Sequence, residues 1–222
     1  MIMKRVRLFF LLPILFLSLN TFGNYQYVVM ETSLGTMKLK LYEDTPLHSE
    51  NFIKLVKEGF YNELLFHRVI KSFMIQTGDP NSKNASSGTR LGSGGPGYTI
   101  PSEFRAQHYH KKGALSAARL PDNINPNKES SGSQFYIVQG NVLTEDHLNA
   151  FEMRGMHIKF TPEQISDYTT IGGTPHLDYE YTVFGEVVEG LEIIDKIASV
   201  PTDQADRPFD DVRILKIYTT EK

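Results

Sequence analysis

An arginine and two glutamines lie inside apolar, β-prone segments, where polar groups are costly to bury unless they are paired. Arg68 and Gln76 fall within Phe66–Asp79, and Gln134 is a lone amide among the aromatic residues of Gly132–Ile137. Taken alone, Arg68 has a simpler interpretation, in which its stem covers apolar surface and its head reaches solvent or a carboxylate. The two segments together indicate an apolar groove that contains a few fixed hydrogen-bond donors.

Other patterns indicate chemistry less strongly. Gly92, Gly94 and Gly97 fit the pattern G-x-G-x-x-G, but Pro96 interrupts it, no strand is indicated before it and no helix after it. We interpret these glycines as tight turns with positive φ in a surface loop. Ser93 lies between them but lacks the G-x-S-x-G spacing of a serine-hydrolase elbow.

Metal and thiol chemistry are disfavoured as well. His108 and His110 could chelate an ion, but no carboxylate cluster stands at ligand spacing, so we interpret both as part of a solvated loop. The absence of cysteine excludes thiol nucleophiles, thiolate zinc sites and disulfides. We therefore expect no metal site and no cofactor.

Short strands must position the polar groups, and strands outnumber helices in the pattern. Tyr27–Thr32 and Thr36–Tyr42 predict a hairpin, and Leu65–Thr77 predicts two strands with a break at residues 71–72. A glycine-rich loop follows from Gly78 to Gly97. Further strands are predicted at residues 113–118, 135–138, 182–188 and 212–218.

Two core helices accompany these strands. Thr45 followed by Pro46 predicts an N-cap and the start of the first helix, whose apolar stripe continues to Phe60. The second helix is expected near residues 191–197, where apolar residues recur at helical spacing. Many short strands with two widely separated helices favour a mainly antiparallel barrel or sandwich.

The stretch from Asn141 to Pro175 interrupts this series and is predicted to be an inserted flap with two short helices. Thr144 is expected to cap the first helix, Thr161 and Gln164 to cap the second, and Gly172 to end it. Its apolar side chains would either pack it against the barrel, which we favour, or form a surface that restricts or recruits substrates. These side chains are Phe151, Met153, Met156 and Phe160.

Residues 1–23 have the pattern of a secretory signal peptide. Three basic residues and no acidic one accompany an apolar run, Leu8–Leu19, that is too short to span a membrane, and Gly23 is the expected end of the signal. We expect residues 24–222 to be one domain that is periplasmic or secreted, without a lipid-anchoring cysteine or stable membrane insertion. Its formal net charge of −6, against −3 for the whole chain, argues against nucleic acid as a partner.

Four blocks of sequence occur in order along the chain. They are F-H-R-V-I-K-S-F-M-I-Q-T-G-D (Phe66–Asp79), G-A-L-S-A-A (Gly113–Ala118), G-S-Q-F-Y-I (Gly132–Ile137) and L-D-Y-E-Y-T-V-F-G (Leu177–Gly185). Together they resemble the cyclophilins, a family of peptidyl-prolyl cis-trans isomerases, and the likeness runs from about Tyr27 to Tyr218. The glycine-rich segment Gly94–Phe104 resembles the bacterial branch of the family.

The resemblance implies a mainly β fold. The expected architecture is a closed eight-stranded antiparallel β-barrel capped by two helices, with the short helical insertion at 141–175 and a substrate groove on its outer face. The implied activity is rotation about X-Pro peptide bonds in proline-containing polypeptides. With the signal peptide, this implies a role in the folding of exported proteins by a monomer that needs no cofactor.

The resemblance also implies roles for individual residues. Arg68 would be catalytic, and Gln76 and the Ala118 region would contact the peptide backbone. The proline pocket would be lined by Phe73, Met74, Tyr136 and Leu177. The other substrate-binding positions would be His67, Arg119, Gln134 and Tyr181.

Four positions depart from the family pattern. Arg119 stands where the family commonly has an asparagine that binds the substrate backbone. Tyr136 replaces a phenylalanine and adds a hydroxyl that needs a partner. His176 and Tyr181 stand where many eukaryotic members have a tryptophan and a histidine.

Arg68 suits the implied reaction. Rotation about an X-Pro bond is opposed by ~18–20 kcal/mol, because the nitrogen lone pair is delocalised into the carbonyl. A guanidinium aimed at the prolyl nitrogen would stabilise that nitrogen as it becomes pyramidal, and the guanidinium needs no proton transfer to do so.

The alternative function is a proline-binding module or holdase with little turnover. Retention of Arg68 beside Phe73, Met74 and Gln76 favours catalysis.

Overall fold

The computed structural model describes residues 26–155 and 159–221, so the expected signal peptide and Met156 lie outside the described residues. The strands are β1 (Tyr27–Thr32), β2 (Gly35–Leu41), β3 (Arg68–Ile70), β4 (Met74–Thr77), β5 (Thr99–Ile100), β6 (Ala114–Ala117), β7 (Ser130–Ser131), β8 (Phe135–Val138), β9 (Val183–Glu189) and β10 (Ile214–Thr220). The helices are α1 (Pro46–Lys57), α2 (Glu145–Met153), α3 (Pro162–Thr170) and α4 (Leu191–Ala198), with short 3-10 turns η1 (Pro80–Ser82) and η2 (Pro175–Leu177). None of the helices in these two ranges is both long and apolar enough to span a bilayer.

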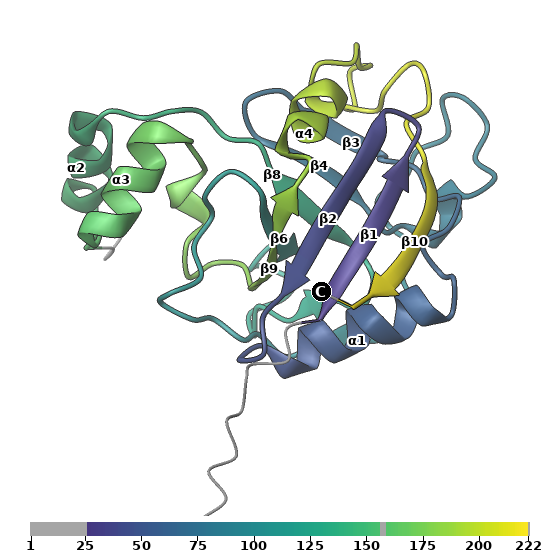
Figure 1. Ribbon diagram of the computed structural model, residues 1–222, viewed down its shortest axis with the longest axis horizontal. Coiled ribbons are helices and arrows are strands. Elements are labelled where there is room, and N and C mark those ends of the chain that lie inside the picture. Colours follow the sequence, from purple (N-terminus) through teal and green to yellow (C-terminus); the bar gives the residue numbers. More distant parts are fainter. Residues whose placement is uncertain (1–25, 156–158, 222) are drawn as a thin grey trace, which may run out of the picture.

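Eight strands form one curled antiparallel sheet, in the order β10-β1-β2-β9-β6-β8-β4-β3 (Figure 1). β1 and β2 are the predicted hairpin, in which Tyr27 pairs with Lys40. β3 and β4 are joined by a tight turn at Ser72, whose φ is +66°, and their register places Arg68 opposite Gln76. β5 and β7 form a separate two-stranded sheet that no sequence pattern indicated.

The prediction of a closed barrel is wrong, because the edge strands β3 and β10 do not pair with each other. The backbone N–H of Val69 donates to the carbonyl of Asp206 (2.8 Å), so a loop rather than β10 takes the outer edge of β3. The segment before β3 lies beside the start of β10, where the N–H of Phe66 donates to the carbonyl of Val212 (2.9 Å) and the N–H of Ile214 to the carbonyl of Leu64 (2.9 Å). The sheet is therefore an open, curled half-barrel.

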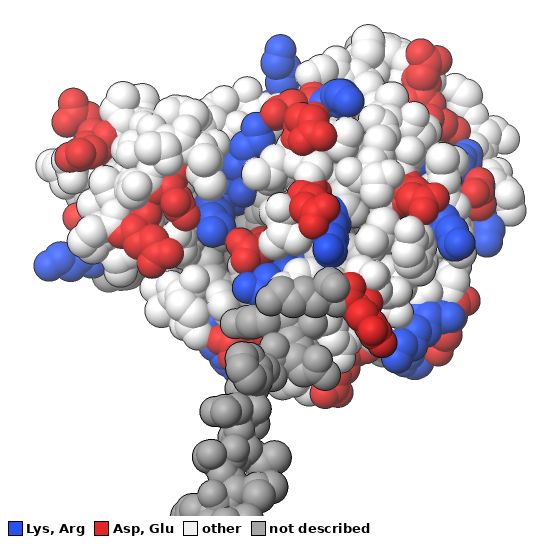
Figure 2. Space-filling model, in the orientation of Figure 1, with Lys and Arg blue, Asp and Glu red and all other residues white. Residues whose placement is uncertain are grey.

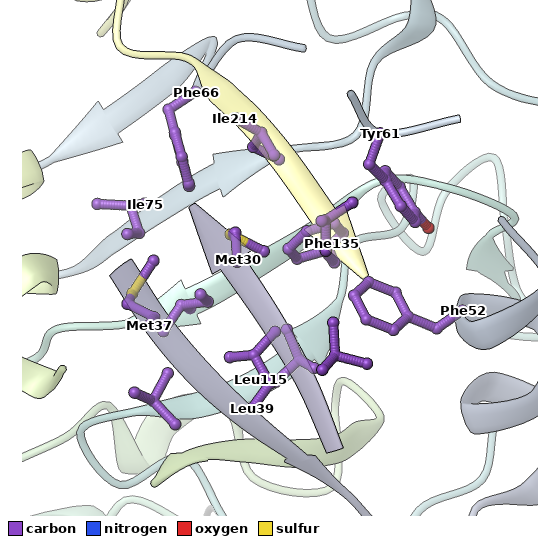
Figure 3. Packing of buried hydrophobic residues seen from close by; sticks show 14 of the residues in the cluster. Met30, Met37, Leu39, Phe52, Tyr61, Phe66, Ile75, Leu115, Phe135 and Ile214 are labelled. Atoms are coloured by element: carbon purple, nitrogen blue, oxygen red, sulfur yellow. The ribbon is translucent and has the colours of Figure 1, made fainter. Parts of the chain in front are cut away.

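Apolar side chains fill the inside of the half-barrel, as Figure 3 shows for Met30, Leu39 and Leu115. The two predicted core helices are present: α1 lies below the sheet and α4 above it in Figure 1. Phe52 of α1 meets Phe135 of β8 edge to face, with ring centres 5.2 Å apart. Such pairs add to the stabilisation that burial already gives.

The start of α1 is held by a residue that is distant in the sequence. Thr45 occupies the predicted cap position, but its side chain makes no capping hydrogen bond. The buried carboxylate of Glu103 instead accepts the backbone N–H groups of Leu47 (3.2 Å) and His48 (3.0 Å). A carboxylate at a helix N-terminus satisfies free N–H groups and interacts favourably with the helix dipole.

The predicted insertion forms α2 and α3, which stand beside the half-barrel in Figure 1. Thr144 and Thr161 cap them as predicted, each accepting the backbone N–H three residues further on (3.2 and 3.3 Å). Phe160 is buried in a small core of its own, whereas Met153 is 87% exposed. The insertion leaves and rejoins the barrel at one place, because the N–H of Gly173 donates to the carbonyl of Asn141 (3.0 Å).

Charged side chains of both signs are mixed over the face seen in Figure 2. Some of them pair across strands, as Lys38 of β2 does with Glu189 of β9 (3.2 Å). This face carries no large patch of one sign that would attract a polyanion.

Candidate active site

A cavity of about 300 Å³ lies on the outer side of the sheet. Neighbouring residues of a strand face opposite sides, so Ile75 and Ile137 fill the interior while Met74 and Tyr136 belong to a second, outer cluster. The cavity is lined by every predicted site residue except Gln134, together with three residues that were not predicted. The lining residues are His67, Arg68, Phe73, Met74, Gln76, Leu91, Gly92, Ala118, Arg119, Tyr136, Leu177, Tyr181 and Ala205.

One wall of the cavity is apolar. Met74 of β4 and Tyr136 of β8 come from neighbouring strands and are 2% and 4% exposed. Leu177 reaches them from η2, and Phe73 packs against the same cluster from the turn before β4. This wall can hold an apolar ring without burying a polar group.

The other wall carries a chain of polar side chains that starts at Arg68. Its Nε lies 3.5 Å from the carboxylate of Asp206, and its Nη1 donates to Oε1 of Gln76 (3.4 Å). Gln76 donates in turn to Oε1 of Gln134 (3.1 Å), and Nε2 of Gln134 donates to the carbonyl of Gly94 (2.7 Å). Gln134 therefore lies behind Gln76 rather than in the cavity. The guanidinium is oriented from two sides while 43% of the Arg68 side chain stays exposed.

The glycine-rich loop closes one side of the cavity. The fully buried carboxylate of Asp79 accepts the N–H groups of Gly92 (2.6 Å) and Gly94 (3.3 Å). A Cβ atom at Gly94 would lie 2.0 Å from Oδ1 of Asp79, so only glycine lets the loop approach this closely. Gly92 and Gly97 have the predicted positive φ (+97° and +89°), whereas Gly94 lacks it and is required by space alone.

His67 is a buried histidine beside the arginine, and it is 4% exposed. Burial lowers the pKa of His67 to about 4, with the charge of Arg68 acting in the same direction. Within the described residues, neither of its ring nitrogens has a hydrogen-bond partner of good geometry. His67 is therefore neutral at neutral pH and contributes ring surface next to Gly92.

Arg119, which was predicted as a substrate-binding residue, lies in the cavity lining and is held against the protein. Its Nε donates to the carbonyl of Glu180 (2.8 Å), and its Nη2 meets the Glu180 carboxylate (3.1 Å). A further pair joins it to Asp122, and its guanidinium lies 4.5 Å from the centre of the Tyr181 ring. These contacts occupy the donors that an approaching peptide backbone would need.

The interpretation of His110 as a solvated loop residue is wrong. His110 is fully buried, with Nδ1 2.8 Å from the carboxylate of Asp178 and Nε2 3.0 Å from the hydroxyl of Tyr136. It supplies the partner that the extra hydroxyl of Tyr136 needs. His108 points elsewhere and pairs with Asp44 (2.6 Å), and the described ranges contain no group of three residues suited to bind a metal.

The sequence matches the family described as "Cyclophilin type peptidyl-prolyl cis-trans isomerase/CLD" over residues 27–219. The chain belongs to this family. Proteins named as peptidyl-prolyl cis-trans isomerases in Staphylococcus saprophyticus and Staphylococcus aureus are 37% and 38% identical to it. These matches cover 90% and 87% of this chain and 94% and 91% of the relatives.

Solved cyclophilin structures have the same fold. The crystal structure of a Cryptosporidium parvum cyclophilin-type isomerase superposes with a TM-score of 0.63 at 25% identity, covering 89% of this chain and 99% of that one. The chain is thus a peptidyl-prolyl cis-trans isomerase, and proline-containing peptides are the substrates of such enzymes.

The insertion of this cyclophilin reaches its cavity through a row of three rings. His176 stacks on Phe73, with centres 5.8 Å apart and planes at 24°. It also stacks on Phe151 of α2, with centres 6.4 Å apart and planes again at 24°. His176 departs from the family pattern, but nothing in the sequence indicates its contact with the insertion.

Sequence reasoning missed several residues of the cyclophilin site. Leu91 and Ala205 line the cavity, Asp206 pairs with Arg68, and Asp178 holds His110. Leu91, Ala205 and Asp206 come from loops, where local patterns carry no signal. Asp178 lies next to Leu177 inside the fourth family block, and this position was the hint that the sequence offered.

Proposed function

We propose that Arg68 is the catalytic residue of this isomerase and that the apolar wall of the cavity holds the substrate proline. The observation that carries the proposal is a half-exposed guanidinium, oriented by Asp206 and Gln76, at the edge of a cavity lined by Met74 and Tyr136. A proline ring seated on that wall would have its nitrogen within reach of a permanently charged donor.

Such an arrangement favours the twisted peptide bond over both planar forms. As the bond rotates, the prolyl nitrogen regains its lone pair, which can then accept a hydrogen bond from Arg68. Because this interaction is stronger in the twisted state than in either planar state, it lowers the barrier and does not merely bind the substrate. The step moves no proton between enzyme and substrate.

The remaining predicted residues fit supporting roles. Gln76 and Ala118 border the cavity next to Arg68, where they could contact the peptide backbone, and Gln134 orients Gln76. We assign His67 and Tyr181 to the cavity walls. We do not assign Arg119 a backbone contact, because Glu180, Asp122 and the ring of Tyr181 already engage its guanidinium.

The decisive test is the exchange rate of a short X-Pro peptide, measured by NMR. We expect Arg68→Ala to lower kcat/KM by about 10²- to 10³-fold, the usual effect of removing one such donor. Arg68→Lys should recover little, because an ammonium group lacks the planar fork held by Asp206 and Gln76. Arg105→Ala removes an exposed arginine that is not among the cavity-lining residues and serves as the control. Peptide binding without faster exchange in the parent protein would favour the binding module instead.

We further propose that the enzyme assists the folding of exported proteins as a monomer in the periplasm or outside the cell. The pattern of residues 1–23 supports export, and a chain without cysteine is compatible with an oxidising compartment. Sequencing the N-terminus of the protein recovered from cell fractions tests it: a chain that starts near Asn24 in the exported fraction supports export. An intact Met1 in the cytoplasmic fraction would contradict it.

A further inference from the structure

A buried chain of hydrogen bonds connects the insertion to the pocket. Asp178 lies at its centre and accepts three hydrogen bonds. The donors are the backbone N–H of His110 (2.8 Å), Nδ1 of His110 (2.8 Å) and the hydroxyl of Tyr168 in α3 (2.6 Å). Nε2 of His110 then lies 3.0 Å from the hydroxyl of Tyr136, which lines the cavity.

The carboxylate of Asp178 can only accept, so Nδ1 of His110 carries a hydrogen. The second ring nitrogen, Nε2, and the Tyr136 hydroxyl can each donate or accept, and in either direction their hydrogen bond joins the two rings. Burial first, and then the negative charge of Asp178, raise the pKa of Tyr168, so its hydroxyl stays protonated and donates.

All four side chains are shielded from water. Tyr168 and His110 are 0% exposed, and Asp178 and Tyr136 are 4% exposed. In such surroundings a lost hydrogen bond is not replaced by solvent, and a change at one member alters the bonds of the next. The rings of His110 and Tyr136 also stack, with centres 6.1 Å apart. The orientation of Tyr136 therefore depends on groups behind it.

We propose that Tyr168 is a positioning residue of the isomerase, which fixes Tyr136 in the proline pocket through Asp178 and His110. The inference rests on the proposed function, in which Tyr136 contacts the proline ring. Through this positioning, the insertion contributes to substrate binding from behind the wall of the pocket. This role is separate from its contact at the cavity, where Phe151 stacks on His176.

The chain offers a matched control in Tyr109. Its hydroxyl donates to the carboxylate of Asp167 at 2.6 Å, the same length as the bond from Tyr168 to Asp178. Tyr109 packs against Tyr168, with ring centres 5.6 Å apart, and is 7% exposed. Asp167, however, pairs with Lys111 (3.6 Å) and makes no hydrogen bond toward the cavity within the described residues.

The experiment compares Tyr168→Phe with Tyr109→Phe in the X-Pro exchange assay. Each variant loses one hydroxyl and one carboxylate bond. Because the side chain of Asp178 is 2% exposed and that of Asp167 is 25% exposed, the free energy of unfolding should fall more in Tyr168→Phe. We expect Tyr168→Phe to raise KM about fivefold to tenfold with kcat nearly unchanged, corresponding to one buried hydrogen bond. Tyr109→Phe should leave KM within about twofold of the parent value. Equal KM values in the two variants would overturn the proposal.

Two further measurements trace the route of the effect. In a Tyr136→Phe background, Tyr168→Phe should no longer change KM, because the hydroxyl through which it acts is gone. His110→Asn keeps a donor near Asp178 but cannot reach Tyr136, so it should reproduce the higher KM even if Tyr168→Phe folds poorly. A KM effect of Tyr168→Phe that persists without the Tyr136 hydroxyl would refute the route.

A spectroscopic signal separates this inference from the proposed function. In protein labelled with ¹³C at tyrosine Cζ, Tyr168→Phe should shift the Tyr136 resonance, whereas Tyr109→Phe should leave it in place. If Arg68→Ala retains the parent rate, the proposed function fails, and the Tyr136 shift still tests the network. If Arg68→Ala abolishes exchange and the Tyr136 resonance does not move in Tyr168→Phe, only the positioning role is lost.

Discussion

The pocket holds one side chain that is always charged beside one that is kept neutral. Arg68 carries its charge at any pH at which the protein folds, whereas burial lowers the pKa of His67 to about 4. In the unfolded chain a histidine binds a proton near pH 6.5. Below that pH the unfolded state binds more protons than the folded state, so the free energy of unfolding falls as the pH falls from 6.5 towards 4.

We expect His67→Gln to remove this part of the pH dependence. Between pH 7 and pH 5, the contribution of His67 to the free energy of unfolding should fall by about 2 kcal/mol in the parent and not at all in the variant. Urea unfolding at the two pH values measures the difference. His48, whose pKa burial also lowers, is present in both proteins and cancels in the comparison. An equal loss of stability in parent and variant would contradict the expectation.

Single residues of the site were predictable where a contiguous motif carries them. Arg68, Phe73, Met74 and Gln76 lie within one block, and the register of β3 and β4 brings Arg68 and Gln76 together. Contacts between distant segments were not predictable. The sequence around His110 predicts a solvated residue, because the carboxylate that binds it, Asp178, lies 68 residues further along the chain.

At the scale of elements, α2 supports the rim of the pocket through one ring. Phe151 stacks on His176, which stacks on Phe73, so the orientation of Phe73 depends partly on a helix outside the barrel. Stacked aromatic pairs are stabilised beyond the burial of their surface.

Phe151→Ala should therefore loosen the rim without affecting the catalytic step. We expect KM for an X-Pro peptide to rise about twofold to fivefold with kcat unchanged, since only part of one stacking interaction reaches the substrate. Met153→Ala is the control, because Met153 lies on the same helix and is 87% exposed. A fall in kcat with unchanged KM would show that the helix acts in another way.

Elements with strong local patterns were predicted well, and their connections were not. The hairpin β1–β2, the break before β4 and both caps of the insertion follow from alternation and capping residues. The cap of α1 comes from Glu103, which no local pattern could name. The barrel was expected to close, but the loop at Asp206 takes the edge of β3, and such competition for one strand edge depends on tertiary contacts.

At the scale of the whole molecule, the insertion can be separated from the half-barrel. Replacing residues 142–172 with a two-residue Asn-Gly turn should leave the barrel folded, because Asn141 and Gly173 already pair. We expect the free energy of unfolding to fall by about 2 kcal/mol, as Tyr109 loses its apolar cover. KM should rise as far as in the double variant Tyr168→Phe/Phe151→Ala, and kcat should stay near the parent value.

Urea unfolding and the X-Pro exchange assay measure both effects. The double variant is the control, because it keeps the insertion but lacks its two contacts with the pocket. Loss of cooperative unfolding in the shortened chain would show that the half-barrel needs the insertion to fold.

The hydrogen bond between Asn141 and Gly173 also bears on how such a protein can change over generations. A segment whose two ends already meet can lengthen or shorten without moving β8 or β9, and the entropy of closing it grows only slowly with its length. This position on the barrel can therefore accept new segments of different length and sequence. Because it lies beside the pocket, each new segment is a chance to alter substrate preference while the residues around Arg68 stay the same.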